Sequence, residues 1–298
     1  MRTKTAILFP AFITEYTQKE IETLSRNKID FNKYIQQASE TLGIDLPAFS
    51  YNSAEYRNDE LLAQVIAYLF SCAGFDLIKK NRVNIDFGAG YSMGIYSGLY
   101  AANSICLTDG IKIIYKAFEL VSELSCTGEY AMAGIIGLTI DDINGIIKNK
   151  NFEIEIINVN SEHSLVIAGK KADVLRMIDF AKIEGALAVT ALNVKTPYHS
   201  EYLKTFANRF SDFVNTLDIK DTEFPIISTF DQRLISTSAE IRKELVYNLT
   251  EKINWYKTMQ TLIKNDVSLF YECGAGKDLS KIARFIDGDF KVIQMHAI

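Results

Sequence analysis

The feature that most constrains the fold is a strand–turn–helix pattern at residues 83–102, which reads VNIDFGAGYSMGIYSGLYAA. Apolar residues alternate over 83–87 and predict a short strand, and the segment around Leu99 predicts a helix. Residues 90–94 between them fit G-x-S-x-G. A sharp strand-to-helix turn needs small flanking residues, and it lifts the central serine to a helix N-terminus. The stretch therefore predicts Ser92 as a nucleophile in an α/β fold.

The motif alone allows another interpretation. G-x-S-x-G occurs by chance in many chains, and Ser92 could simply be an N-cap that opens the helix after a glycine-rich turn. The strand before the motif and the helix after it favour the nucleophile.

Composition excludes several classes of protein. The 298 residues, 48% hydrophobic and 23% charged, suit one large globular domain or two moderate ones. A net charge of −5 argues against nucleic acid as a partner. We expect no membrane partner, because no apolar run reaches the ~18 residues of a span. The first apolar segment is too short for a signal peptide and reads as a strand.

Cysteines and histidines indicate neither a disulfide framework nor a metal site. The four cysteines are scattered without a C-x-x-C pair, as expected for reduced thiols in a cytoplasmic protein. No two of the histidines, His163, His199 and His296, lie at zinc-ligand spacing.

The order of elements predicts two parts. Strands at 5–9 and 83–87 and helices at 61–75 and 111–124 alternate as in α/β folds. Between 127 and 193 the pattern becomes β-α-β-β-α-β, which is ferredoxin-like. We expect a large subdomain of residues 1–126 and 194–298 and a small inserted subdomain of residues 127–193. Helices at 200–215, 239–249 and 254–264 and strands at 225–228 and 269–273 return to the large part.

Four segments, in this order, carry a resemblance to a known family. They are the strand end LFP at 8–10, the turn GYSMG at 90–94, PYHS at 197–200 and YECGAGK at 271–277. Through them the chain resembles the malonyl-CoA:acyl-carrier-protein transacylases, which load carrier proteins in fatty acid and polyketide synthesis. The resemblance covers essentially the whole chain. It implies an α/β-hydrolase-like large subdomain with a parallel sheet.

The resemblance also implies a chemistry. Ser92 would attack the thioester of an acyl-CoA substrate, and His199 would take its proton, oriented by a backbone carbonyl. The backbone N–H groups of Met93 and Phe12 would form the oxyanion hole. The acyl group would then pass to the phosphopantetheine thiol of an acyl carrier protein. No permanently bound cofactor is expected.

The sequence departs from the family around the substrate. Expected substrate-binding residues are Tyr91, Ala117, Phe118, Asn160 and Tyr198. The loop after Pro10 reads AFITE where the family has G-Q-G-S-Q, Tyr91 replaces a histidine and Ile95 a glutamate. Ala117 stands where malonyl-specific members carry an arginine for the malonyl carboxylate. A buried carboxylate without a partner is costly, so we expect a neutral acyl group.

Other interpretations stay open. An alignment slip of one residue would offer Lys116 in place of the arginine, and the apolar replacements could be ordinary drift in packing. The same serine and histidine would serve an acyl hydrolase that clears stalled carrier proteins. A weakly active scaffold that binds a carrier protein is a third hypothesis. Expected carrier-docking cations are Lys195, Lys204, Lys277, Lys281 and Arg284.

Overall fold

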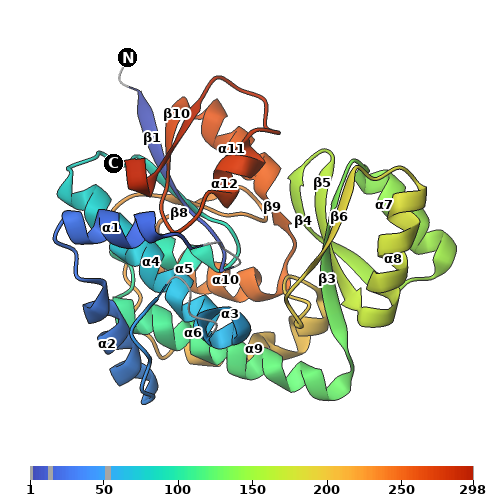
Figure 1. The fold of residues 1–298 in the computed structure, drawn as a ribbon, viewed down its shortest axis with the longest axis horizontal. Helices are drawn as coiled ribbons and strands as arrows, with labels where there is room; N and C mark the ends of the chain where they lie inside the picture. Colours follow the sequence, from blue (N-terminus) through green and yellow to red (C-terminus); the bar gives the residue numbers. More distant parts are fainter. Residues whose placement is uncertain (1–2, 13–15, 51–54, 298) are drawn as a thin grey trace.

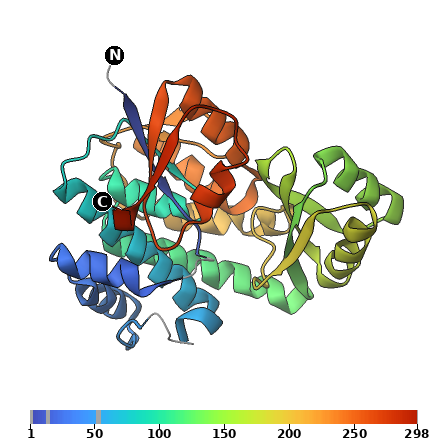
Figure 2. The same ribbon diagram turned by 45° about the horizontal axis from the view of Figure 1, so that its top comes forward.

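Two β-sheets organise the chain. The computed structural model describes residues 3–12, 16–50 and 55–297. A six-stranded sheet has the strand order β11-β10-β1-β2-β7-β8, and a five-stranded sheet has the order β6-β3-β5-β4-β9. Figures 1 and 2 show the small sheet with helices α7 and α8 as a separate lobe beside the larger one. Of the expected loop after Pro10, residues 13–15 lie outside the described part of the chain.

The large sheet is mainly parallel. Strand β1 (Lys4–Phe9) pairs in parallel with β10 (Val267–Glu272) and with β2 (Phe87–Gly90). Strand β10 also pairs in parallel with β11 (Lys291–Gln294), and β2 with β7 (Ile226–Ile227). Only β8 (Leu234–Ile235) runs antiparallel to its neighbour, β7, among the pairings described. The apolar β1 is almost wholly buried, as expected for a central parallel strand covered on both faces.

Helices cover this sheet on both faces. The helices before the small lobe are α1 (Gln18–Arg26), α2 (Phe31–Leu42), α3 (Glu55–Asn58), α4 (Glu60–Lys80), α5 (Gly94–Ala101) and α6 (Leu107–Ser122). Those after it are α9 (Ala207–Val214), α10 (Ser238–Thr250), α11 (Trp255–Lys264) and α12 (Asp278–Ala283). Short 3-10 helices lie at η1 (Glu123–Thr127), η2 (Glu201–Phe206) and η3 (Met295–Ala297).

Helix α4 forms the centre of the largest core. In the described chain it is the one helix long and apolar enough to cross a membrane, but 78% of that apolar window is buried within the protein. Its Phe70 is fully buried and stacks on Phe31 of α2, with ring centroids 4.1 Å apart. The apolar surface of α4 is therefore covered by neighbouring helices.

The small sheet has the expected β-α-β-β-α-β order. It contains β3 (Tyr130–Ile136), β4 (Ile154–Ser161), β5 (Ser164–Lys170) and β6 (Ala188–Leu192), joined by α7 (Ile140–Lys150) and α8 (Lys171–Ile183). Strand β9 (Ile253–Asn254), from much later in the chain, adds to its edge in parallel with β4. The predicted fold class is confirmed, whereas the bounds 127–193 of the insert stay a prediction.

Two predicted elements differ from the structure. The predicted strand at 83–87 is wrong by several residues, because pairing with β1 begins only at Phe87. Asp86 ends the preceding loop by accepting a hydrogen bond from the Thr5 N–H, at 2.9 Å, with its side chain. The single helix predicted at 200–215 is divided into η2 and α9.

Candidate active site

The turn between β2 and α5 presents Ser92 with strained backbone geometry. Ser92 has a φ of 56°, in the left-handed region that only a few per cent of non-glycine residues adopt. Steric crowding explains the two flanking glycines. A Cβ at Gly90 would lie 2.1 Å from the Ile95 nitrogen, and one at Gly94 would lie 2.2 Å from the carbonyl oxygen of Phe9. The G-x-S-x-G pattern is thus dictated by a backbone folded tightly against β1.

His199 contacts Ser92, although the two residues are far apart in the sequence. The Oγ of Ser92 lies 2.7 Å from the Nε2 of His199, which is 107 residues later in the chain. His199 is 3% exposed and also has a positive φ, 61°. The end of α10 holds both residues: His199 N–H donates to the Leu249 carbonyl at 3.2 Å, and the Asn248 amide donates to the Ser92 carbonyl at 3.1 Å.

Burial keeps His199 neutral. Loss of solvation lowers the pKa of His199 to about 4, while the backbone carbonyl of Asn248 opposes this shift. Within the described chain, Nδ1 has no partner at hydrogen-bond geometry. The nearby carbonyl favours the tautomer with the proton on Nδ1, which leaves Nε2 free to accept a proton from Ser92.

A cavity of about 410 Å³ opens over this serine–histidine pair. Its walls come from the segment after β1, from the turn at Ser92, from the small sheet and from α12. Most of the sheet residues in the wall are aliphatic, for example Met132, Val166 and Leu192. The predicted site residues that line it are Phe12, Tyr91, Ser92, Asn160, Tyr198 and His199. Met93 follows Ser92 and is buried.

Tyr91 connects the serine turn to the small sheet. Its hydroxyl donates to Oδ1 of Asn160 at 2.9 Å and accepts from Nδ2 of Asn158 at 2.8 Å. Its ring packs edge-on against Trp255, with centroids 5.4 Å apart. Asn158 and Trp255 were not predicted as site residues. Oδ1 of Asn158 is buried, lies at the cavity and has no partner in the described structure.

Tyr198 is fixed by a second polar network. Its hydroxyl donates to Oε1 of Glu60 at 2.8 Å and accepts from Nε2 of Gln64 at 3.0 Å. Its ring packs edge-on against Phe12, with centroids 6.5 Å apart. Burial and the charge of Glu60 hold the pKa of Tyr198 well above its usual value. Sequence reasoning missed Glu60 and Gln64, although two polar residues four apart in the apolar α4 are an available signal.

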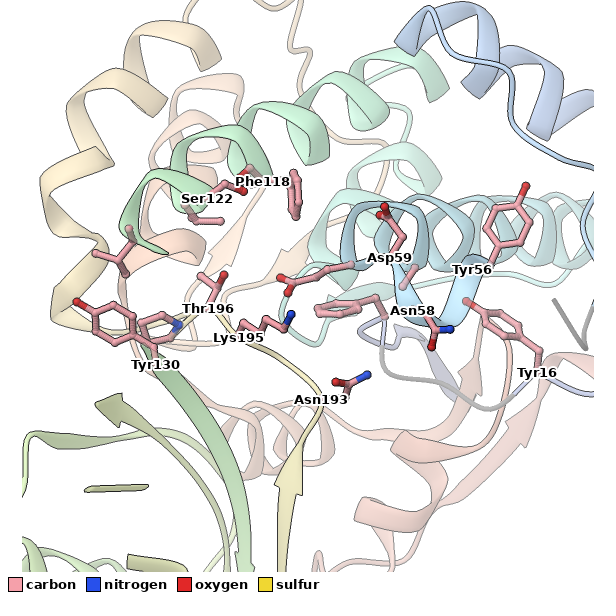
Figure 3. Close-up of a pocket in the computed structure, with 16 residues that line it drawn as sticks. Tyr16, Tyr56, Asn58, Asp59, Phe118, Ser122, Tyr130, Asn193, Lys195 and Thr196 are labelled. Atoms are coloured by element: carbon pink, nitrogen blue, oxygen red, sulfur yellow. Dashed lines mark hydrogen bonds between the residues drawn. The ribbon is translucent and has the colours of Figure 1, made fainter. Parts of the chain in front are cut away.

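A second cavity of about 430 Å³ shares the wall residue Phe12 with the first. Figure 3 shows its side chains converging from α6, from the α3–α4 junction and from the segment after β6. Phe118 and Glu60 line it. Ala117 lies in the core and lines neither of these cavities. Lys116 is paired with Glu119 at 2.6 Å on the surface of α6.

The remaining predicted residues are distributed as follows. His163 and His296 line neither cavity. Three of the predicted docking cations, Lys277, Lys281 and Arg284, are exposed on or beside α12, which borders the Ser92 cavity. Lys195 lines the second cavity, and Lys204 is paired with Glu201.

Glu272 lies in the fourth of the family-like segments, YECGAGK at 271–277, and its contacts explain why this segment is built as it is. This buried carboxylate at the end of β10 accepts the backbone N–H groups of Leu279 at 2.8 Å and Ser280 at 3.0 Å. An acidic group at a helix start is stabilised by the helix dipole. Glu272 thereby fixes the start of α12 beside the cavity mouth.

Comparisons with known proteins agree with this geometry. No family model matches the chain. The malonyl CoA-acyl carrier protein transacylase of Staphylococcus aureus (strain MSSA476) is 28% identical over 99% of this chain and 96% of its own length. FabD from Acinetobacter baumannii is 27% identical with a TM-score of 0.89, covering 100% of this chain and 95% of that one. A type II polyketide malonyl-transacylase, in complex with its acyl carrier protein, has a TM-score of 0.88 at 24% identity, covering 98% and 96%.

Fold and site together define an S-acyltransferase of mixed α/β fold with a serine–histidine pair under a long cavity. Within that class, the full-length similarity is specific. Over nearly its whole length the chain is similar to malonyl CoA-acyl carrier protein transacylases.

Proposed function

We propose that the chain transfers an acyl group from acyl-CoA to the thiol of a carrier-protein phosphopantetheine, through an acyl-serine at Ser92. The observation that carries the proposal is the 2.7 Å contact between Ser92 Oγ and His199 Nε2 at the floor of a cavity. Serine is a weak nucleophile until a base removes its proton, and a buried neutral imidazole is such a base.

Ser92 and His199 carry out the bond changes and proton transfers of both half-reactions. Nε2 of His199 takes the Ser92 proton as Oγ forms a bond to the thioester carbon, and the C–S bond then breaks. The proton on His199 passes to the departing CoA sulfur. In the second half the phosphopantetheine thiol gives its proton to His199 and its sulfur forms a bond to the acyl carbon. The C–O bond to Ser92 then breaks, and His199 returns the proton to Ser92 Oγ.

Backbone donors would stabilise the oxyanion of each tetrahedral intermediate. The N–H of Met93 lies directly after the nucleophile, and Phe12 lines the same cavity as Ser92. We assign the oxyanion hole to these two N–H groups, in line with the family pattern. Preorganised donors of this kind contribute on the order of 3 kcal/mol each to catalysis.

The cavity suits a phosphopantetheine arm. The arm is flexible, with apolar stretches between two amides, and the cavity offers aliphatic walls from the small sheet. The unpartnered Oδ1 of Asn158 can accept one amide N–H of the arm. The partner in the second step would be an acyl carrier protein, as in the complex of the polyketide relative.

A neutral, unbranched acyl group fits the site better than malonyl. The position of the family's arginine is Ala117, which is buried in the core, and Phe118 adds apolar surface to the second cavity. Lys116 is paired with Glu119 on the surface of α6 and lines neither cavity. A bidentate arginine–carboxylate pair in a desolvated site discriminates by more than about a hundredfold, and that pair is missing here.

The test is acyl loading followed by intact-mass measurement. Incubation with butyryl-CoA should add one acyl group on the Ser92 peptide, and this adduct should be absent from Ser92→Ala. Malonyl-CoA should load more slowly than butyryl-CoA. Addition of a holo carrier protein should move the acyl group onto its thiol. Release of free acid at the same rate without any acyl-carrier product would identify a hydrolase instead, and an unchanged adduct on Ser92→Ala would contradict the proposal.

A further inference from the structure

The second cavity combines aromatic walls with two carboxylates and one cation. Aromatic side chains form much of its wall: Phe12, Tyr16, Tyr56, Phe118 and Tyr130. Two carboxylates, Asp59 and Glu60, lie at the start of α4 and line the same space. Figure 3 shows Asp59 on one side of this space and Lys195 on the other. Among the described residues of the wall, Lys195 is the only cation.

Glu60 has acceptor capacity left over. A carboxylate offers about four lone-pair positions. The Tyr198 hydroxyl occupies one on Oε1, and the backbone N–H of Lys195 also acts on this carboxylate. Burial raises the pKa of Glu60, while these two donors and the positive charge of Lys195 favour its charged form. The remaining lone pairs belong to a half-buried group that lines the cavity.

The position of Glu60 relates it to the acyl group. Tyr198, which donates to Glu60, precedes His199 in the chain and lines the Ser92 cavity, and Phe12 lines both cavities. A thioester bound at Ser92 has the pantetheine arm on one side of its carbonyl and the acyl chain on the other. With the arm in the Ser92 cavity, as proposed above, the neighbouring aromatic cavity is left for the end of the acyl chain.

We propose that this second cavity holds the end of the acyl group, and that Glu60 selects acyl groups ending in a hydrogen-bond donor, a hydroxyl or an ammonium. This inference rests on the proposed acyl-serine mechanism. A terminal hydroxyl donates to a free lone pair of Glu60 while the methylenes pack on the aromatic rings. A terminal methyl leaves the carboxylate unpaired, and a terminal carboxylate meets like charge from Glu60 and Asp59.

A series of acyl-CoAs with equal chain length tests the inference. Butyryl, 3-hydroxypropionyl and β-alanyl groups end in methyl, hydroxyl and ammonium, and malonyl ends in carboxylate. Initial loading rates on Ser92 are measured by intact mass at equal, subsaturating concentrations. The hydroxyl or ammonium thioester should load about tenfold faster than butyryl, the factor that matches the net contribution of a single hydrogen bond. The faster of the two donors identifies whether the natural group is neutral or cationic.

Glu60→Gln separates recognition from structure. The amide oxygen still accepts the Tyr198 hydroxyl, but the charge is lost, so the ratio of 3-hydroxypropionyl to butyryl loading should fall toward one. An exposed control on α1, Glu22→Gln, should keep the wild-type ratio. If Glu60 only anchors Tyr198, its variant will slow all four thioesters by the same factor, which would overturn the inference.

The outcomes also separate this inference from the proposed function. Loading by butyryl-CoA without preference for either donor would refute the role of Glu60 and leave the acyl-serine mechanism standing. Fastest loading by malonyl-CoA would show that Lys195, not Glu60, dominates the cavity. Absence of any Ser92 adduct with all four thioesters would contradict the proposed function, and the inference with it.

Discussion

His199 combines a strained backbone with a buried side chain that contacts Ser92. Its positive φ is maintained because Leu249 fixes its N–H and Ser92 faces its ring. Strain of this kind persists only where the surrounding structure over-determines the conformation. The proposed base is therefore preorganised before substrate arrives, which limits the reorganisation needed during the reaction.

Removal of this imidazole should slow acyl loading without unfolding the chain. His199→Ala leaves Ser92 without a proton acceptor at 2.7 Å, so the loading rate should fall by ~10²–10⁴, as for other positioned bases. Rapid-quench intact mass gives the rate, and circular dichroism checks the fold. A loss below about threefold with the fold intact would mean that another group takes the proton.

The pH dependence of loading should reflect the lowered pKa of His199. The ring accepts a proton only when it is neutral, and a pKa of about 4 makes it neutral throughout the range above pH 5. The kcat/KM for loading should therefore be flat from about pH 5 to 8 and fall as pH drops through about 4. A midpoint near 6.5, the value of an exposed histidine, would show that substrate entry leaves the ring solvated.

Helix α12 brings positive charge to the mouth of the Ser92 cavity. Glu272 fixes its first turn, Leu279 and Ile282 line the cavity, and Lys277 and Arg284 lie exposed at its two ends. The chain carries a net charge of −5, so an acidic carrier protein would be repelled by most of the surface. A local group of basic residues next to the site offsets this repulsion and speeds the association of the two proteins.

Reversal of these two charges should weaken carrier-protein docking selectively. The double variant Lys277→Glu, Arg284→Glu should raise the KM for the carrier protein several-fold, because it adds like charge facing an acidic partner. Acyl loading from CoA, measured without carrier, should change much less. Lys148→Glu on α7, exposed on the small lobe, is the control. Equal effects of the double variant on both half-reactions would refute a docking role.

Stability depends on the helical core around α4 rather than on the surface of the molecule. Phe70 is fully buried between Phe31 and Phe49, with ring centroids 4.1 and 4.9 Å away. Phe285, after α12, is 58% exposed. The two phenylalanines have the same chemistry, and their different burial predicts different contributions to the free energy of unfolding.

Truncation of the buried ring should cost far more than truncation of the exposed one. Phe70→Ala should lower the free energy of unfolding by about 3–5 kcal/mol, because it removes buried area and leaves a cavity. Phe285→Ala should change it by about 0.5 kcal/mol or less. Urea unfolding followed by tryptophan fluorescence measures both. Similar shifts for the two variants would mean that the α4 core is already loosely packed.

From the sequence alone we predict the class of fold, the resemblance to the transacylases and the two residues of the proposed dyad. Ser92 could be predicted from the sequence because its constraint is local. The tight turn excludes side chains at Gly90 and Gly94, so the crowding shows in five consecutive residues. Hydrophobic periodicity likewise predicted the β-α-β-β-α-β order of the small lobe. The start of β2 could not be predicted, because alternating apolar residues at 83–87 are also compatible with a loop that leads into the sheet.

The polar residues around the dyad follow from the packing of the folded chain. Glu60 lies 138 residues from Tyr198, and Asn158 lies 67 residues from Tyr91, yet each pair shares a hydrogen bond. No periodicity links residues so far apart, since their contact depends on how α4 and the small sheet pack against the serine turn. Packing likewise placed Ala117 in the core and Phe118 at the second cavity, because two adjacent positions on a helix face different directions.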